Sequence, residues 1–251
     1  MKKRSHYRGQ LVLFLLFSLC FLALSSVFLY TSLFLSGPSV KAAAPPSNHS
    51  PVTVIIDAGH GGEDGGAVGI NGALEKDINL EVAKKTQLFL SSFGIKSVLT
   101  RDSDVLLYDR NEDYEGRKKV LDMQTRRKIA ESYGNAVFVS IHQNAFPQEK
   151  YSGFQVYYSP NNEESRALAE LLEGSVRESL QPQNGRDSKP SGGSIYLLDK
   201  LNCPTVLIEC GFMSNAEECE KLSTEEYQNQ LAAVIASSIA EFVGGYEWSD
   251  G

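Results

Sequence analysis

Cysteine is scarce in this sequence, and its positions exclude two kinds of cross-linked structure. The 251 residues include four cysteines, Cys20, Cys203, Cys210 and Cys219, and no repeated Cys-x-x-Cys pair. Cys203 and Cys210 flank a predicted strand, where seven residues of extended chain span about 23 Å. A disulfide requires Cα atoms within ~7 Å of each other. A disulfide framework and a cysteine-based zinc site are therefore both excluded.

Acidic residues are absent from residues 1–50, which contain five basic residues. Four of the basic residues precede an uncharged run, rich in leucine and phenylalanine, from Leu11 to Leu35. A helix of this length rises roughly 37 Å, enough to cross a ~30 Å hydrocarbon core. The basic flank predicts that the following chain lies outside the cytoplasm. We interpret residues 1–43 as a signal peptide, cleaved near Ala42-Ala43-Ala44, or as a retained signal anchor that holds the chain at the membrane.

The rest of the chain is acidic and has a globular composition. The whole chain has 24 basic and 31 acidic residues, so 19 basic residues remain against 31 acidic ones after residue 50. A chain with this excess of negative charge repels a nucleic-acid backbone, so no binding of nucleic acid is expected. Hydrophobic residues make up an ordinary 42% of the chain. We expect a polar, proline-rich tether over residues 44–51, one domain over residues 52–243, and a C-terminal tail over residues 244–251.

Strand and helix patterns alternate along the predicted domain. Short β-branched runs predict buried strands, and apolar residues at helical spacing predict helices. The expected strands are 52–56, 96–100, 136–141, 153–158 and 205–208, and the expected helices are about 75–90, 121–133, 164–180 and 223–242. Asn161 and Glu164 resemble a capping box. Residues 101–120 are predicted to form a surface loop, and residues 181–193 a loop that overhangs a site. The alternation favours a single α/β domain, a mostly parallel twisted sheet with helices on both faces.

Histidine is scarce as well, and the two histidines of the predicted domain directly follow strands. The chain has four histidines, of which His6 and His49 lie within the first 50 residues. His60 and His142 each follow an apolar run. In open α/β sheets, ligands bind beyond the carboxyl ends of the strands. The positions of these two side chains therefore predict a metal site.

Carboxylates complete the candidate site. Glu75 begins the helix that returns from a glycine-rich loop, and two histidines with one glutamate bind zinc in a way that leaves a position open for water. Spacing alone leaves Glu63, Asp64 and Glu81 as alternatives to Glu75. Glu209 ends an apolar strand and is a candidate general base and acid, although by itself it also fits the role of a salt-bridge partner.

Four ordered motifs resemble those of a known family. They are residues 57–67 (DAGHGGEDGGA), Glu75, residues 140–145 (SIHQNA) and residues 209–215 (ECGFMSN). The series is similar to that of the zinc-dependent N-acetylmuramoyl-L-alanine amidases with an AmiC-like catalytic domain. The resemblance implies that His60, Glu75 and His142 bind Zn²⁺. It implies that Glu209 is catalytic. The implied reaction is hydrolysis of the amide between N-acetylmuramic acid and L-alanine in peptidoglycan, which releases the stem peptide.

Within that family, three features resemble the germination-specific, spore-cortex amidases of endospore-forming bacteria. They are residues 120–127, residues 144–147 with 151–153, and a single domain behind an export segment. This resemblance implies an extracytoplasmic enzyme of the cell wall or spore cortex, which prepares muramic acid for conversion to its δ-lactam. Some family members depend on an activating protein partner, and such a partner is a hypothesis for this chain too.

Two alternative functions remain open at this point. The same zinc site fits another peptidoglycan hydrolase, such as a carboxypeptidase that acts inside the stem peptide. A peptidoglycan-binding module that has kept the fold and lost turnover is the second alternative. The complete set of His60, Glu75, His142 and Glu209 argues against this second alternative.

Overall fold

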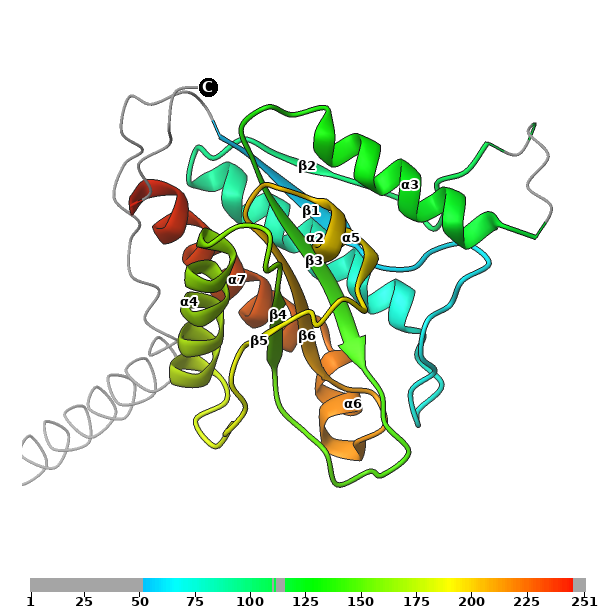
Figure 1. Cartoon of the computed structure of the whole chain (residues 1–251). Coiled ribbons are helices and arrows are strands. Elements are labelled where there is room, and N and C mark those ends of the chain that lie inside the picture. Colours follow the sequence, from blue (N-terminus) through cyan, green and yellow to red (C-terminus); the bar gives the residue numbers. More distant parts are fainter. Residues whose placement is uncertain (1–51, 110, 112–115, 246–251) are drawn as a thin grey trace, which may run out of the picture. The chain divides into compact units, whose positions relative to one another are not determined.

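The computed structural model describes residues 52–109, 111 and 116–245, and in this part of the chain a six-stranded sheet is packed between helices (Figure 1). The strands are β1 (Thr53–Ala58), β2 (Ser97–Leu99), β3 (Ala136–Asn144), β4 (Gln155–Tyr158), β5 (Lys189–Pro190) and β6 (Thr205–Phe212). The helices are α2 (Glu75–Ser92), α3 (Lys118–Glu131), α4 (Glu164–Ser179), α5 (Tyr196–Lys200), α6 (Ala216–Leu222) and α7 (Glu225–Gly245). The predicted export segment, the tether and most of the tail lie outside the described residues. None of the helices described here has the length and apolar character of a membrane span.

The sheet has the order β2-β1-β3-β6-β4-β5 and is mostly parallel, which confirms the predicted fold class. Strands β2, β1, β3 and β6 run in one direction, whereas β4 is antiparallel to β6 and parallel to β5. A parallel neighbour usually needs a helical crossover between the two strands. No helix lies between β3 and β4, so the chain turns back and β4 enters the sheet reversed.

Helices cover both faces of the sheet because side chains alternate between the faces along each strand. Val54 and Ile56 of β1 belong to the larger apolar cluster, which includes buried residues of α2, α4 and α7 (Figure 1). Ile55, between them, belongs to a smaller cluster on the opposite face, with Ala130 of α3 and Leu197 of α5. Both faces of the central strands are therefore buried, as their continuous apolar runs predict.

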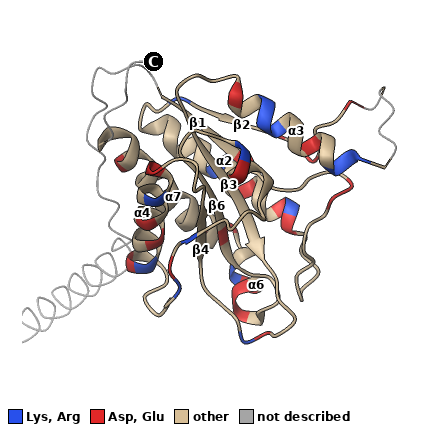
Figure 2. Ribbon diagram, in the orientation of Figure 1, with Lys and Arg blue, Asp and Glu red and all other residues tan. Residues whose placement is uncertain are grey.

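Two buried arginines hold the end of β1. Arg126 of α3, a helix rich in charged residues (Figure 2), is 0% exposed and donates to Asp57 Oδ1 at 2.6 Å. It also donates to the carbonyls of Ala58 and His60, both at 2.7 Å. Arg101 donates to the carbonyls of Ala58, Gly59 and Lys76, also from a buried position. The prediction of a surface loop over residues 101–120 is therefore wrong at Arg101, where these three backbone carbonyls and that of Ser103 replace water as the partners of the guanidinium.

Asp57 is ionised at the centre of this buried network. Burial alone would raise the pKa of its carboxyl, but the Arg126 charge and the hydroxyls of Ser140 and Thr100 outweigh burial and lower the pKa below its ordinary value. Ser140 and Thr100 both donate to Asp57 at 2.6 Å. The network thus links β1, β3, α3 and the residue after β2.

Some local predictions need correction. Asn161 does not cap α4; its amide donates instead to the carbonyl of Asp199 at 2.8 Å, and Asn162 Oδ1 accepts from the backbone N–H of Glu164. Strand β6 continues four residues beyond its predicted end at Ile208 and thereby includes Glu209. Helices α5 and α6 were not predicted; they have five and seven residues, too few to establish a helical period in the sequence.

A buried carboxyl on α4 makes stability depend on pH. Glu173 accepts from the backbone N–H of Val156 at 2.9 Å, and burial raises its pKa to about 7. Folding therefore favours the protonated form of Glu173. The stability it contributes is complete below the unfolded-state pKa near 4.5 and is lost as the pH rises through about 7. At pH 8, we expect Glu173→Gln to raise the free energy of unfolding by about 1–2 kcal/mol.

Urea unfolding between pH 4 and pH 8 measures this effect. Glu170→Gln, on the exposed side of the same helix, is the control, and it should follow the wild-type pH profile. Parallel pH profiles for Glu173→Gln and the wild type would contradict the prediction.

Candidate metal centre

His60 adopts a conformation that is rare for a residue with a side chain. Its φ is +61°, in the left-handed region, and its carbonyl is held there by Arg126. Its Nδ1 donates to Asp64 Oδ2 at 3.0 Å, and its Nε2 lies 3.2 Å from Glu75 Oε1. A carboxylate on the far nitrogen of a histidine is the usual support of a metal-binding imidazole. The near nitrogen, Nε2, therefore faces the candidate centre.

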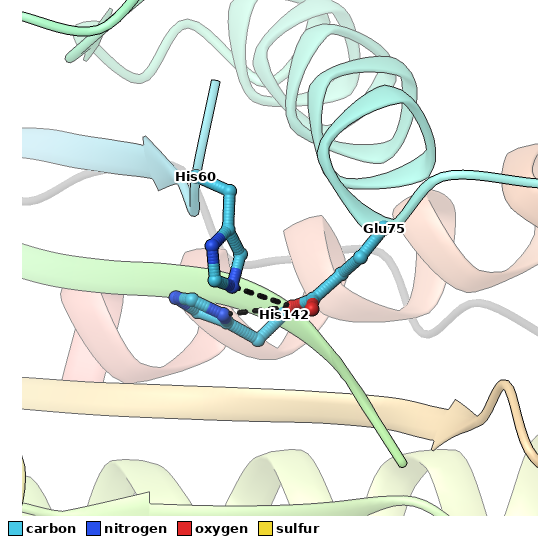
Figure 3. A group of neighbouring side chains, drawn as sticks. All are labelled: His60, Glu75 and His142. Carbon is cyan, nitrogen blue, oxygen red and sulfur yellow. Dashed lines mark hydrogen bonds and ion pairs between the residues drawn. The ribbon is translucent and has the colours of Figure 1, made fainter. Parts of the chain in front are cut away.

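Glu75 lies at the middle of the cluster, as the first residue of α2 (Figure 3). It is 4% exposed, and its Oε2 accepts from the backbone N–H of Ala67 at 2.8 Å. Its Oε1 lies 2.9 Å from His142 Nδ1 and 3.2 Å from His60 Nε2. Burial favours the neutral acid, but hydrogen bonds and charges from the two histidines outweigh burial and hold the pKa of Glu75 well below its ordinary value. The carboxylate is therefore ionised and aimed at both imidazoles.

His142 is the third member, near the end of β3. Its ring lies edge-to-face with that of His60, with the centroids 4.9 Å apart. The ring occupies the space that a side chain at residue 59 would need, so only glycine fits at Gly59. The ligand atoms of His60, Glu75 and His142 all lie within 4.8 Å of one another.

These residues fit a zinc ion. Two imidazole nitrogens approach one carboxylate oxygen, and a divalent cation between them would be bound by all three atoms. Burial opposes a positive charge on His60, but Glu75 and Asp64 outweigh burial and raise its pKa above the ordinary value, so the surroundings favour a positive charge here. Nitrogen from two histidines and oxygen from one carboxylate form a donor set found in zinc hydrolases. The observed chemistry thus agrees with the zinc dependence that the resemblance implies.

Glu209 lies next to this cluster, on β6 directly opposite His142 of β3. Its Oε2 is buried and has no hydrogen-bond partner among the described residues. Burial raises the pKa of Glu209 to about 7, with a further contribution from Glu75, against the lowering effects of His142, His60 and Arg186. A buried carboxyl with a pKa near neutrality can both accept and donate a proton at physiological pH.

The structure separates Glu75 from the three alternatives that spacing left open. Glu63 pairs with Lys118 across the loop, and Glu81 pairs with Lys85 on the exposed side of α2. Asp64 contacts His60, but on the nitrogen that faces away from the cluster. Of the four candidates, only Glu75 touches both histidines.

Several supporting residues were not identified from the sequence. Asn79 donates to Glu75 Oε1 at 3.4 Å, and Gln143 donates to Asn79 through its side chain and to Glu75 through its backbone N–H. Asn79 lies one helical turn after Glu75, so an i, i+4 pairing was a signal available in the sequence. Gln143 and Asp64 are close to the two histidines in the sequence, but only the fold determines where their side chains point.

Gly59→Ala is expected to displace the His142 ring and to weaken zinc binding at least ~10-fold, because an added methyl group would overlap with that ring. Zinc titration against a competing chelator measures the effect. Gly134→Ala is the control, because nothing lies within 4 Å of a methyl group added at that position. Equal zinc affinity in the two variants would show that contact between residue 59 and His142 does not constrain the centre.

Comparison with known proteins identifies close relatives. A family model described as N-acetylmuramoyl-L-alanine amidase matches residues 54–241. The chain is 34% identical over 189 residues to the germination-specific N-acetylmuramoyl-L-alanine amidase of Bacillus subtilis (strain 168), covering 75% of this chain and 78% of that relative.

Solved structures give the same result. The CwlD amidase from Clostridioides difficile, determined in complex with the GerS lipoprotein, matches with a TM-score of 0.72 and 38% identity, over 76% of this chain and 98% of that one. The catalytic domain of CwlV, an N-acetylmuramoyl-L-alanine amidase from Bacillus (Paenibacillus) polymyxa, matches with a TM-score of 0.63 and 33% identity, over 76% and 97%. The matched family region includes all four candidate site residues.

Proposed function

Because this chain belongs to the N-acetylmuramoyl-L-alanine amidase family, whose members hydrolyse the amide between N-acetylmuramic acid and L-alanine in peptidoglycan, we propose that a zinc ion held by His60, Glu75 and His142 supports that reaction here. We further propose that Glu209 is its general base and acid. The observation that carries both assignments is the convergence of two imidazole nitrogens on Glu75 Oε1, beside a buried carboxyl oxygen of Glu209 that has no partner among the described residues.

The residues around the centre hold protons at defined atoms. Asp64 accepts from His60 Nδ1, which keeps the proton on that atom and leaves Nε2 free to bind. The backbone N–H of Ala67 donates to Glu75 Oε2, and this hydrogen bond keeps Oε1 directed at the histidines. A bound zinc ion would polarise the scissile carbonyl and acidify a water molecule.

Glu209 performs the proton transfers in this proposal. Its carboxylate accepts a proton from the attacking water and then donates it to the nitrogen of L-alanine as the C–N bond breaks. Both steps need one group whose pKa is close to the working pH, and burial brings the pKa of Glu209 to about 7. The products are a free stem peptide and a glycan with bare muramic acid.

The biological role that we propose is maturation of the spore cortex outside the cytoplasm. The likeness to the germination-specific amidase of Bacillus subtilis and to the CwlD amidase of Clostridioides difficile supports this role. Residues 1–43 serve as the export segment in this proposal, residues 44–51 as the tether and residues 52–243 as the catalytic domain. Because the Clostridioides difficile enzyme was determined with a lipoprotein, we also propose that an activating protein partner engages this chain.

Mass spectrometry of digested peptidoglycan tests the proposed reaction. Incubation of the zinc-loaded protein with purified glycan strands should release intact stem peptides and leave bare muramic acid. Shortened stems still attached to the glycan would identify a carboxypeptidase instead. An unchanged substrate that still binds the protein would favour the noncatalytic module. For the cortex role, deletion of the gene should remove muramic δ-lactam from spores, and its persistence would exclude that role.

A further inference from the structure

A row of side chains leads from the metal centre across the sheet to a third strand. His142 on β3 is directly opposite Glu209 on β6, and Glu209 is in turn directly opposite Gln155 on β4. Facing positions on neighbouring strands direct their side chains to the same side of the sheet. With strands about 4.8 Å apart, Gln155 lies roughly 10 Å from His142 along this row.

Gln155 orients an arginine at the end of the row. Its side chain is 1% exposed, and its Oε1 accepts from Arg186 Nη2 at 2.7 Å and from Arg186 Nε at 3.2 Å. The amide of Gln155 donates to the carbonyl of Asp187 at 2.7 Å. The Gln155 side chain is therefore hydrogen-bonded to two neighbouring residues of the loop. One edge of the guanidinium is used in this way. The edge formed by Nη1 and Nη2 keeps donors available for a ligand.

The surrounding residues are shaped to hold the Arg186 side chain in place. The guanidinium carbon lies 5.0 Å from the centroid of the Phe212 ring, at the end of β6. Gly153 has φ +102°, and any side chain there would collide with Asn184 and crowd the Arg186 stem. Asn184 in turn donates to the carbonyl of Phe154 at 2.8 Å. The loop over residues 181–193, which the sequence placed over a site, thus presents Arg186 at Gln155, within electrostatic range of Glu209.

Arg186 has no acidic partner in the part of the chain that the structure describes, where no carboxylate lies within 4 Å of it. Its neighbour Arg177, by contrast, pairs with Asp187 at 3.3 Å. Arg186 is half-buried, and its charge acts on Glu209. It also acts at longer range on Glu173 and Glu218. A planar guanidinium that is oriented, stacked on an aromatic ring and not paired directly with any of these carboxylates fits a ligand carboxylate bound through two hydrogen bonds.

We propose that Arg186 is a specificity-determining residue that binds the carboxylate carried by the stem peptide one residue beyond the scissile amide. The inference rests on the proposed function, because it places the scissile amide between the metal centre and Glu209. After L-alanine, the stem continues with a γ-linked D-glutamate, whose α-carboxyl is either free or amidated. The free form supplies a planar anion about two strand spacings from the centre, and the carboxamide does not.

The experiment compares two matched substrates in the zinc-loaded protein. Both are glycan strands with the same stem peptides, and they differ only in a carboxylate or a carboxamide at the second residue. For the wild type, we expect kcat/KM to be at least ~10-fold higher with the carboxylate, mostly through a lower KM. In Arg186→Gln, this preference should fall to about one, whereas Arg186→Lys should keep part of it. Arg166→Gln, an exposed arginine paired with Glu170, should keep it all.

Because the preference is a ratio measured within one preparation, partial unfolding of a variant does not change it. A wild type that cleaves both substrates equally well would overturn the role of Arg186 and leave the amidase activity intact. Persistence of the full preference in Arg186→Gln would overturn it too. A wild type that cleaves neither substrate would contradict the proposed function, and the inference about Arg186 would fall with it.

Discussion

Glu209→Gln is expected to lower the rate of stem-peptide release at least ~100-fold while leaving the zinc content unchanged. Glutamine has nearly the same shape as glutamate but cannot carry a proton between water and the leaving amine. Glu209 does not touch Glu75 or either histidine through a hydrogen bond, so its substitution leaves the three proposed ligands in place. The measurement is the initial rate of release of free stem peptides, with zinc quantified in the same samples.

Glu217→Gln is the control for this variant. Glu217 lies a few residues away on α6, pairs with Lys221 on the surface, and should tolerate the same chemical change without loss of rate. Loss of zinc together with activity in Glu209→Gln would identify Glu209 as a supporting residue of the centre. A full rate with full zinc content would remove Glu209 from the mechanism.

Arg126→Met is expected to lower the free energy of unfolding by about 3–5 kcal/mol. Methionine fills much of the same space but leaves two buried carboxylates, Asp57 and Asp122, without the guanidinium that now contacts both. The variant also removes the donor that holds the His60 carbonyl in its left-handed conformation. Zinc affinity should therefore fall together with stability.

Arg127→Met is the control, because it removes an arginine from the same helix without removing the guanidinium that contacts Asp57 and Asp122. Arg127 is the next residue on α3, is only partly buried and pairs with Glu131 near the surface, an arrangement that stabilises a fold weakly. Urea unfolding at pH 7 gives both values. Similar stability of the two variants would show that the buried network of Asp57, Asp122 and Arg126 does not support the end of β1.

The sequence predicted the central sheet well because its strands have a strong local pattern. The β-branched run of β1 and the apolar run of β3 are buried on both faces, and both were recognised. The reversal of β4 was not predicted, because strand direction depends on the connection and the neighbour, neither of which appears in a short pattern. Arg101 and Arg126 were not recognised as buried, because an arginine inside a charged segment has the pattern of a surface residue.

The candidate site, like the fold, was predicted from local patterns only in part. The two histidines were predictable from their positions directly after strands, whereas spacing left Glu75 as one of four acidic candidates and only the family resemblance selected it. The fold distinguishes them, since Glu63 and Glu81 pair with lysines elsewhere. Arg186 lies in a polar loop with no distinctive spacing, and it becomes notable only through Gln155, which the sheet register brings opposite Glu209.

Anomalous X-ray diffraction at the zinc edge, from crystals of the zinc-loaded protein, tests the central claim most directly. The account predicts one zinc ion per catalytic domain, with bonds of about 2 Å to a nitrogen of His60, an oxygen of Glu75 and a nitrogen of His142. The carboxyl of Glu209 should face that ion without binding it. A zinc ion bound by other residues, or three side chains that remain paired with one another in saturating zinc, would contradict the account.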